Sequence, residues 1–421
     1  MSEGFKVVVA HKGAREHFLA ARALHRRGCL ATLVTDWYSP LPPHWASRAK
    51  RLGPGVARAL GAGAPDLPRA KILAFNSFGL ASRWELSRAE KKGCLIEAMA
   101  RNDQDFARRV AQARLPGHDV FLGYSYAALE ALQAERERGM LTLVDQIDPG
   151  RMEWDIIQEE AARWPQYAGP MEVAPVGYYE RAVAEWKVAQ LILVNSAWSR
   201  SALVKQGADP ARIAVIPLAY EAAPSTATPP ERRDGTLSVL WLGSVILRKG
   251  IAYLMEAAKQ LAGEPVRFVV AGPSELRPEV MAQAPSSIQW LGQVPRSEVA
   301  RLYQSADVFV LPTLSDGFAI TQVEALAYGR PVVTTPNCGD VVEDGRTGFI
   351  VPARDATALA DALRRFVRDP RLAGAMRPAC LETAARFSID AFADRLTSII
   401  RKGLAAQAHD TAARGGKVGA P

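Results

Sequence analysis

Two carboxylates stand at a fixed spacing in the segment 308–333. An apolar run at 308–311 leads into a turn with Asp316 and Gly317, and a helical pattern that carries Glu324 follows before a second apolar run. The free N–H groups and the dipole of such a helix start favour an anion such as phosphate. Asp316 precedes the helix and Glu324 lies two turns inside it, so both can face one ligand. Two carboxylates beside a phosphate site suit the hydroxyls of a sugar, because carboxylates accept strong hydrogen bonds.

A second group of candidate residues follows the apolar run 237–242. It comprises Gly243, Ser244, Arg248, Lys249 and Gly250, and an amphipathic helical pattern begins directly after it. Lysine and arginine beside a glycine turn can bind an anionic phosphate. The signal is weak alone, but its place ahead of the carboxylate segment strengthens it.

Both segments resemble the signature of retaining GT-B glycosyltransferases, especially family 4. Glu324 and the pair Lys249-Gly250 match that signature, whereas Asp316 replaces its first glutamate, Ala319 a glycine and Ser244 an arginine. Further segments extend the resemblance over about residues 236–365. It implies the GT-B fold, an α/β architecture of two doubly wound, Rossmann-like domains that face each other across a cleft.

The resemblance also implies roles in binding the donor. Asp316 and the backbone of Gly317–Ala319 would hold the donor sugar, and Glu324 would bind the nucleotide ribose. Lys249 would clamp the diphosphate, and Arg248 could supply the charge missing at Ser244. The expected donor-binding residues are Gly13, Ala14, Gly243, Ser244, Arg248, Lys249, Gly272, Val294, Asp316, Gly317, Phe318, Ala319, Ile320, Thr321 and Glu324.

The amino-terminal half matches the family more loosely. Its Gly13-Ala14 turn follows a predicted strand, and His11 and Lys12 lie near the cleft by topology. The family's acceptor-side histidines are missing, so Asp145 or Asp148 would take that role. The catalytic candidates are therefore Lys249, Asp316, Asp145 and Asp148.

The implied reaction is metal-independent, retaining transfer of a sugar from a nucleotide-diphosphate donor to a hydroxyl of a glycan or lipid-linked acceptor. No cofactor and no metal site are expected. Two alternatives stay open: another GT-B enzyme, such as a nucleotide-sugar epimerase, and a non-catalytic GT-B subunit. The donor sugar, the base and the acceptor are not specified by any residue.

The elements that must position these residues form two sets of alternating strands and helices, which predicts parallel sheets. We expect an acceptor-side domain at 1–221, with an irregular basic insertion at 40–93, and a second irregular stretch at 149–180. A Pro/Ser/Thr-rich linker is predicted at 222–235 and the donor domain at 236–386. A helix at 387–405 would pack back toward the first domain, and a disordered tail would follow at 406–421.

The composition sets the remaining limits. The chain has 421 residues and a net charge of +8, and no apolar run approaches the length of a membrane-spanning helix. Four scattered cysteines indicate a reducing cytoplasm. Residues 1–93 carry 16 basic and 6 acidic residues, a net charge of +10. We therefore expect an anionic partner, such as the inner face of a membrane or an anionic glycan. Nucleic acid is not expected, since no binding motif is present.

Overall fold

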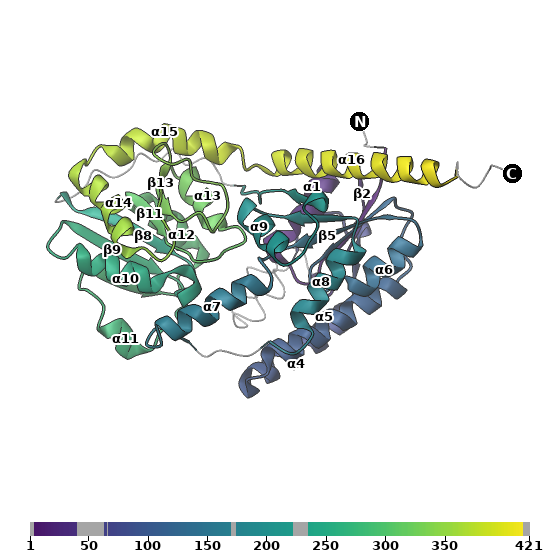
Figure 1. Cartoon of the computed structure of the whole chain (residues 1–421), viewed down its shortest axis with the longest axis horizontal. Coiled ribbons are helices and arrows are strands. Elements are labelled where there is room, and N and C mark those ends of the chain that lie inside the picture. Colours follow the sequence, from purple (N-terminus) through teal and green to yellow (C-terminus); the bar gives the residue numbers. More distant parts are fainter. Residues whose placement is uncertain (1–3, 40–62, 65, 170–173, 222–234, 416–421) are drawn as a thin grey trace.

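The computed structural model of the chain describes residues 4–39, 63–64, 66–169, 174–221 and 235–415, and it contains two parallel β-sheets (Figure 1). The first sheet has seven strands in the order β3-β2-β1-β4-β5-β6-β7. These strands are β1 (Val7–Ala10), β2 (Leu30–Thr35), β3 (Ile72–Ala74), β4 (Val120–Tyr124), β5 (Leu141–Gln146), β6 (Leu191–Val194) and β7 (Ile213–Val215).

The second sheet has six strands in the order β10-β9-β8-β11-β12-β13. In each sheet the strand order reverses once, between β1 and β4 and between β8 and β11, which is the doubly wound arrangement. Ligands in such sheets bind outside the carboxyl ends of the strands at that reversal. The strands are β8 (Leu237–Leu242), β9 (Val266–Ala271), β10 (Ile288–Gly292), β11 (Val308–Leu311), β12 (Val332–Thr334) and β13 (Gly348–Ile350).

Helices cover both faces of each sheet (Figure 1). Those of the first half are η1 (Arg15–Phe18), α1 (Leu19–Arg26), η3 (Arg69–Lys71), α4 (Asn76–Lys92), α5 (Leu95–Gln112), α6 (Leu129–Glu137), α7 (Arg151–Arg163), α8 (Tyr178–Val188), α9 (Ala197–Lys205) and η4 (Pro210–Arg212). Those that follow are η6 (Leu247–Lys249), α10 (Ile251–Gln260), α11 (Pro278–Ala282), α12 (Arg296–Ser305), α13 (Ile320–Ala327), α14 (Ala356–Arg368), α15 (Leu372–Ala385) and α16 (Ile389–Gly415).

The central strands, such as β1, β4 and β11, are apolar on both faces, because helices bury both faces of a parallel sheet. In β1, Val7 and Val9 belong to one apolar cluster of the first half, whereas Val8 and Ala10 belong to the cluster on the opposite face. The second half is built around one large cluster that includes the fully buried Trp241. These clusters hold the carboxyl ends of the strands in fixed positions.

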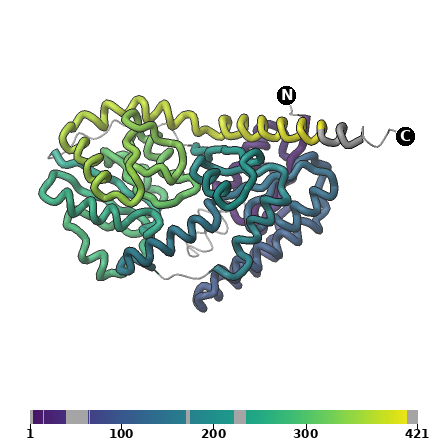
Figure 2. The backbone as a smooth tube through the Cα atoms, in the orientation of Figure 1, coloured from purple at the N-terminus to yellow at the C-terminus, as the bar shows by residue number. Residues whose placement is uncertain are grey.

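Two helices join the halves. Helix α7 follows β5 of the first sheet, yet its side chain Glu160 accepts a hydrogen bond of 2.8 Å from the hydroxyl of Tyr253 on α10. Helix α16 leaves the second half and runs along the first (Figure 2). There Phe392 and Leu396 join the same buried cluster as Leu24 of α1.

The structure differs from the sequence predictions in several segments. Residues 63–93 of the predicted irregular insertion include β3 and α4, and the stretch 149–180 includes α7. Helix α16 continues to Gly415, so residues 406–415 are helical where disorder was expected. The predicted linker lies outside the described residues from 222 to 234, as do 40–62 of the insertion and 416–421 of the tail. Within the described ranges, no helix is long and apolar enough to cross a membrane.

Candidate functional site

A glycine allows the loops after β8 and β11 to pack directly against each other. Gly250 has φ +85°, and a Cβ atom there would lie 1.9 Å from the carbonyl oxygen of Pro312, so no other residue fits. The carbonyl of Arg248 accepts hydrogen bonds from the Leu314 amide at 2.8 Å and the Thr313 hydroxyl at 3.1 Å. The two sequence motifs therefore form one surface at the point where the strand order reverses.

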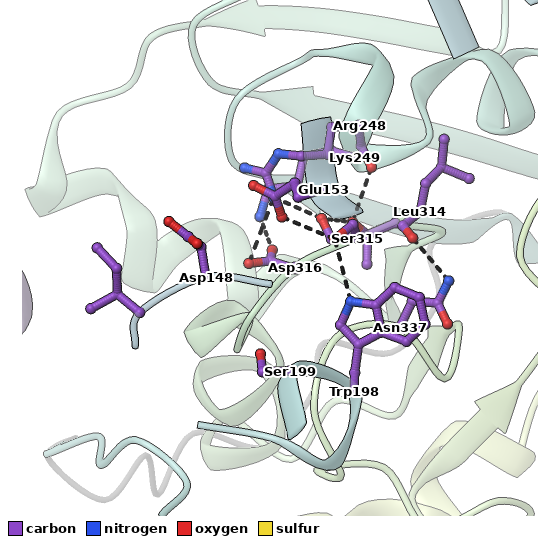
Figure 3. A network of polar contacts seen from close by, with 12 residues as sticks. Asp148, Glu153, Trp198, Ser199, Arg248, Lys249, Leu314, Ser315, Asp316 and Asn337 are labelled. Atoms are coloured by element: carbon purple, nitrogen blue, oxygen red, sulfur yellow. Dashed lines mark hydrogen bonds and ion pairs between the residues drawn. The ribbon is translucent and has the colours of Figure 1, made fainter. Parts of the chain in front are cut away.

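Two cations of the first loop converge on the carboxylate of the second. The Lys249 ammonium donates to Oδ2 of Asp316 (Figure 3). One guanidinium nitrogen of Arg248 lies 2.7 Å from the carbonyl oxygen of Ser315 and 3.9 Å from Oδ1 of Asp316. Arg248 therefore lies beside Lys249, where a second cation was expected, whereas Ser244 is exposed.

A second carboxylate, Glu153 of α7, completes this cluster and was not among the residues predicted from the sequence. Its Oε2 lies 3.4 Å from Arg248 and accepts a 3.0 Å hydrogen bond from the Ser315 hydroxyl, which also accepts one from Trp198 of α9 at 3.3 Å (Figure 3). Burial raises the pKa of Glu153 to about 7, with Asp148 and Asp316 adding to the rise and Arg248 opposing it. Its only signal in the sequence is an acidic residue shortly after a predicted strand.

The first half also closes over the turn that follows Asp316. A Cβ atom on Gly317 would lie 2.7 Å from the carbonyl oxygen of Ile147 and 2.9 Å from the side-chain nitrogen of Asn195. The amide of Ala319, which was expected to face the donor, donates to the carbonyl of Cys338 at 3.2 Å. At Gly317 the two halves therefore pack together with no room for a side chain.

Glu324 lies on α13 and lines a different part of the region between the halves. It borders a cavity of about 650 Å³ together with Phe318 and Ile320 of the second half and Glu16 and His17 of the first. Its Oε2 accepts a 2.8 Å hydrogen bond from Tyr303, whose hydroxyl also lies 3.2 Å from the carbonyl of Thr321. Burial raises the pKa of Glu324.

Glycines also shape the carboxyl edge beyond the charged cluster. Gly272 has φ +144°, and a Cβ atom on it would lie 1.9 Å from the carbonyl oxygen of Gly243. The backbones of these two predicted donor residues are thus in direct contact. Val294 is half-buried beside the core of the second half.

In the first half, the end of β1 is held by acidic side chains. The amide of Gly13 donates to Asp36 at 2.6 Å, and Lys12 pairs with Asp103 at 2.6 Å. Ala14 lies next to Gly13 and packs against the buried cluster that includes α1. The imidazole of His11 stacks on the ring of Tyr124 with centroids 3.8 Å apart.

The two acceptor-side candidates lie in different surroundings. Burial and the nearby Glu16 carboxylate raise the pKa of Asp145 well above its usual range, and Asp145 is hydrogen-bonded to Tyr124. Asp148 accepts from the Tyr126 hydroxyl at 3.0 Å and lines a cavity of about 290 Å³. Asp148 is also near enough to Glu153 for its charge to raise the pKa of that residue. In the described part of the chain, no three His, Cys, Asp or Glu side chains gather as a metal site would require.

Comparisons with known proteins support this architecture. Residues 236–369 match the family model described as Glycosyl transferases group 1. Sucrose-phosphate synthase from Thermosynechococcus elongatus superposes with a TM-score of 0.59 at 18% identity, covering 96% of this chain and 100% of that one. HepE of Anabaena, solved in complex with UDP and glucose, gives a TM-score of 0.58 at 14% identity, covering 94% and 100%. The expected GT-B fold is thereby confirmed.

Curated relatives match over part of their length. An alpha-D-kanosaminyltransferase of Streptomyces kanamyceticus is 29% identical over 174 residues, which cover 39% of this chain and 45% of that protein. A D-inositol 3-phosphate glycosyltransferase of Corynebacterium diphtheriae is 29% identical over 258 residues, 54% of this chain and 60% of that one. The chain thus spans about half the length of the curated relatives it matches. The chain has the GT-B fold, and its residues 236–369 match the domain of the group 1 glycosyltransferases.

Proposed function

We propose that this protein is a glycosyltransferase that moves a sugar from a nucleotide-diphosphate donor to a hydroxyl of a glycan or lipid-linked acceptor. The observation that carries the proposal is the convergence of Arg248 and Lys249 on Asp316 at the point where the strand order of the second sheet reverses. The leaving group of such a transfer is a diphosphate, and negative charge develops on it in the transition state. Cations fixed in advance beside that position lower the barrier.

The remaining residues have separate roles in this proposal. Lys249 and Arg248 stabilise the departing phosphate, Asp316 holds the sugar hydroxyls, and Glu324 binds the ribose. Asp148 supports the acceptor hydroxyl in preference to Asp145, because it lines a cavity and its charge reaches Glu153 of the cluster. The names of the relatives and the UDP complex of HepE are consistent with a nucleotide-sugar donor.

The first experiment is a thermal-shift screen of the full chain with UDP-, GDP- and ADP-sugars, since a ligand of the folded state raises the melting temperature. The stabilising donor is then incubated with candidate acceptors. Stabilisation by a nucleotide sugar followed by sugar transfer supports the proposal. No stabilisation by any nucleotide sugar contradicts it.

Product analysis separates the alternatives. Conversion of the donor to its epimer without an acceptor would indicate a nucleotide-sugar epimerase, whereas donor binding without hydrolysis or transfer would indicate a non-catalytic subunit. We further propose that transfer retains the anomeric configuration and needs no metal ion. NMR of the anomeric proton in the product tests retention, and full activity after treatment with EDTA is the expected result for metal independence.

We also propose peripheral contact with an anionic membrane on the acceptor side. Helix α4 supports this, because Leu80 and Trp84 on it are 56% and 65% exposed. The guanidinium of Arg88 lies over the Trp84 ring at 4.4 Å from its centroid, and Lys91 is exposed one turn later. Exposed Trp and Leu beside basic side chains suit an interface of anionic lipid headgroups.

A further inference from the structure

The cavity that contains Asp148 extends toward α4 and α5 of the first half. Its lining includes Lys12, Asp36, Arg83, Asp103 and Asp148, so five charged side chains face about 290 Å³ of space. The charge of Asp148 also reaches Glu153, which contacts Arg248 of the second half (Figure 3). Arg83 comes from α4, the helix proposed above to face the membrane.

The three carboxylates of this cavity already have hydrogen-bond donors. Asp103 pairs with Lys12 at 2.6 Å, and Asp36 accepts from the Gly13 amide at 2.6 Å. Asp148 accepts from the Tyr126 hydroxyl at 3.0 Å and from the Gly150 amide at 2.8 Å. Each carboxylate of the cavity is therefore hydrogen-bonded within the protein, and Asp103 is also ion-paired.

Arg83 is different. Its guanidinium lies over the ring of Trp37 with its central carbon 4.7 Å from the ring centroid. Its Nη1 is buried and has no hydrogen-bond partner among the described residues. Burial lowers the pKa of Arg83, and the nearby Asp36 only partly opposes this effect. Arg83 nevertheless lines the cavity, and within the described residues no carboxylate forms an ion pair with it, so an anion that enters the cavity can pair with its guanidinium.

We propose that Arg83 binds an anionic group of the acceptor, a carboxylate or a phosphate, while Asp148 in the same cavity contacts the acceptor hydroxyl. The inference rests on the proposed function, since it assigns this cavity to the acceptor. Arginine suits either anion because its planar guanidinium can donate two parallel hydrogen bonds. The cation–π contact with Trp37 holds the guanidinium in place before the ligand arrives.

The test measures binding of three monosaccharides to the full chain by isothermal titration calorimetry. Glucose is neutral, glucuronate carries a carboxylate and glucose 6-phosphate carries a phosphate. Saturating UDP is present throughout to occupy the donor site, so that the anions do not bind at Arg248 and Lys249. Arg83→Gln removes the charge, and Arg108→Gln is the matched control, because it removes an exposed guanidinium from the neighbouring α5.

We expect at least one of the two anionic sugars to bind about tenfold or more tightly than glucose, and Arg83→Gln to abolish that preference. Arg108→Gln should retain it. Equal affinity for all three sugars, or a preference that survives Arg83→Gln, would overturn the inference. The melting-temperature rise caused by UDP, measured separately on the wild type and on both variants, distinguishes the two proposals. Its absence in the wild type counts against the donor site, whereas its presence without an anion preference counts against Arg83 alone.

Discussion

Lys249 is the residue on which the proposed chemistry depends most directly. In the structure it is paired with Asp316, so a donor diphosphate would meet a cation that is already positioned. We expect Lys249→Ala to lower the transfer rate by roughly 10²-fold or more, the scale of losing one electrostatic stabiliser. Lys259→Ala is the control, since Lys259 is an exposed lysine of α10 paired with Glu256. The measurement is kcat with the identified donor, and near-normal turnover by Lys249→Ala would refute the assignment.

Glu324 allows a second prediction at the residue scale. It is half-buried beside Tyr303 on the wall of the cavity between the halves. If it binds the ribose, Glu324→Gln should weaken binding of both UDP and a UDP-sugar, because the neutral amide accepts a weaker hydrogen bond from a hydroxyl. The dissociation constants of both ligands should rise about tenfold. Calorimetric titration of UDP measures the effect, and unchanged affinity would place the ribose elsewhere.

The raised pKa of Glu153 predicts that the stability of the protein depends on pH. Its pKa of about 7 in the folded protein lies above the value of 4.5 expected in the unfolded chain. Between these values the folded state binds the extra proton, so the contribution of Glu153 to stability falls as the pH rises from about 4.5 to about 7. Glu153→Gln cannot ionise. It should therefore gain stability relative to the wild type across this window, on the order of 2–3 kcal/mol by pH 8.

Denaturant unfolding of the wild type, Glu153→Gln and Glu159→Gln at pH 5 and pH 8 tests this prediction. Glu159 lies on the same helix but is mostly exposed and pairs with Arg354, so its variant should show no such pH-dependent gain. The prediction is wrong if the free energy of unfolding differs between Glu153→Gln and the wild type by the same amount at both pH values. The carboxylate of Glu153 would then not be held in the protonated form near neutrality.

At the scale of elements, helix α4 carries the prediction for membrane contact. Leu80, Trp84, Arg88 and Lys91 repeat at helical spacing and share one exposed face. Leu80→Ser combined with Trp84→Ser should lower sedimentation with phosphatidylserine-containing vesicles several-fold, because the side chains that enter the lipid interface are lost. Binding should also weaken as salt is raised, since the basic side chains contribute through charge.

The matched control for the charges uses α16, which lies on the opposite side of the molecule (Figure 1). Arg88→Glu with Lys91→Glu should abolish binding to anionic vesicles, whereas Arg395→Glu with Lys402→Glu should retain it. Equal loss in both pairs would show that net charge alone decides binding, and equal sedimentation with neutral phosphatidylcholine vesicles would contradict an anionic surface.

Some helices and strands could be predicted from the sequence and others could not. The long apolar strands and the two loops with Lys249 and Asp316 were predictable, because periodicity and glycine turns are local features. Strands β3, β7, β12 and β13 have three residues each, too few for a periodic pattern, and only β12 was predictable, as the apolar run that follows the Asp316 motif. The place of Glu153 could not be predicted, since it depends on α7 packing against the second half through contacts such as Glu160 with Tyr253.

At the scale of the whole molecule, the site exists only where the two halves meet. Arg248 and Asp316 belong to the second half, whereas Glu153 and Trp198 reach them from helices of the first. Helices α7 and α16 connect the halves on different sides of the molecule (Figure 1). The relative position of the halves therefore controls whether the cluster is complete, as expected for enzymes that close over a donor.

Gly317 provides the test of this closed arrangement. A Cβ atom on it would approach the backbone oxygen of Ile147 to 2.7 Å, and a backbone atom cannot move aside as a flexible side chain can. Gly317→Ala should therefore separate the halves without unfolding either one. Small-angle X-ray scattering should give a larger radius of gyration, the melting temperature should change little, and transfer should fall about tenfold or more, since misplacement by about 1 Å can cost 10²-fold. Gly117→Ala is the control because nothing lies within 4 Å of its added methyl group. If Gly317→Ala matches that control in both scattering and transfer, the halves need not come together at Gly317 for the reaction to proceed.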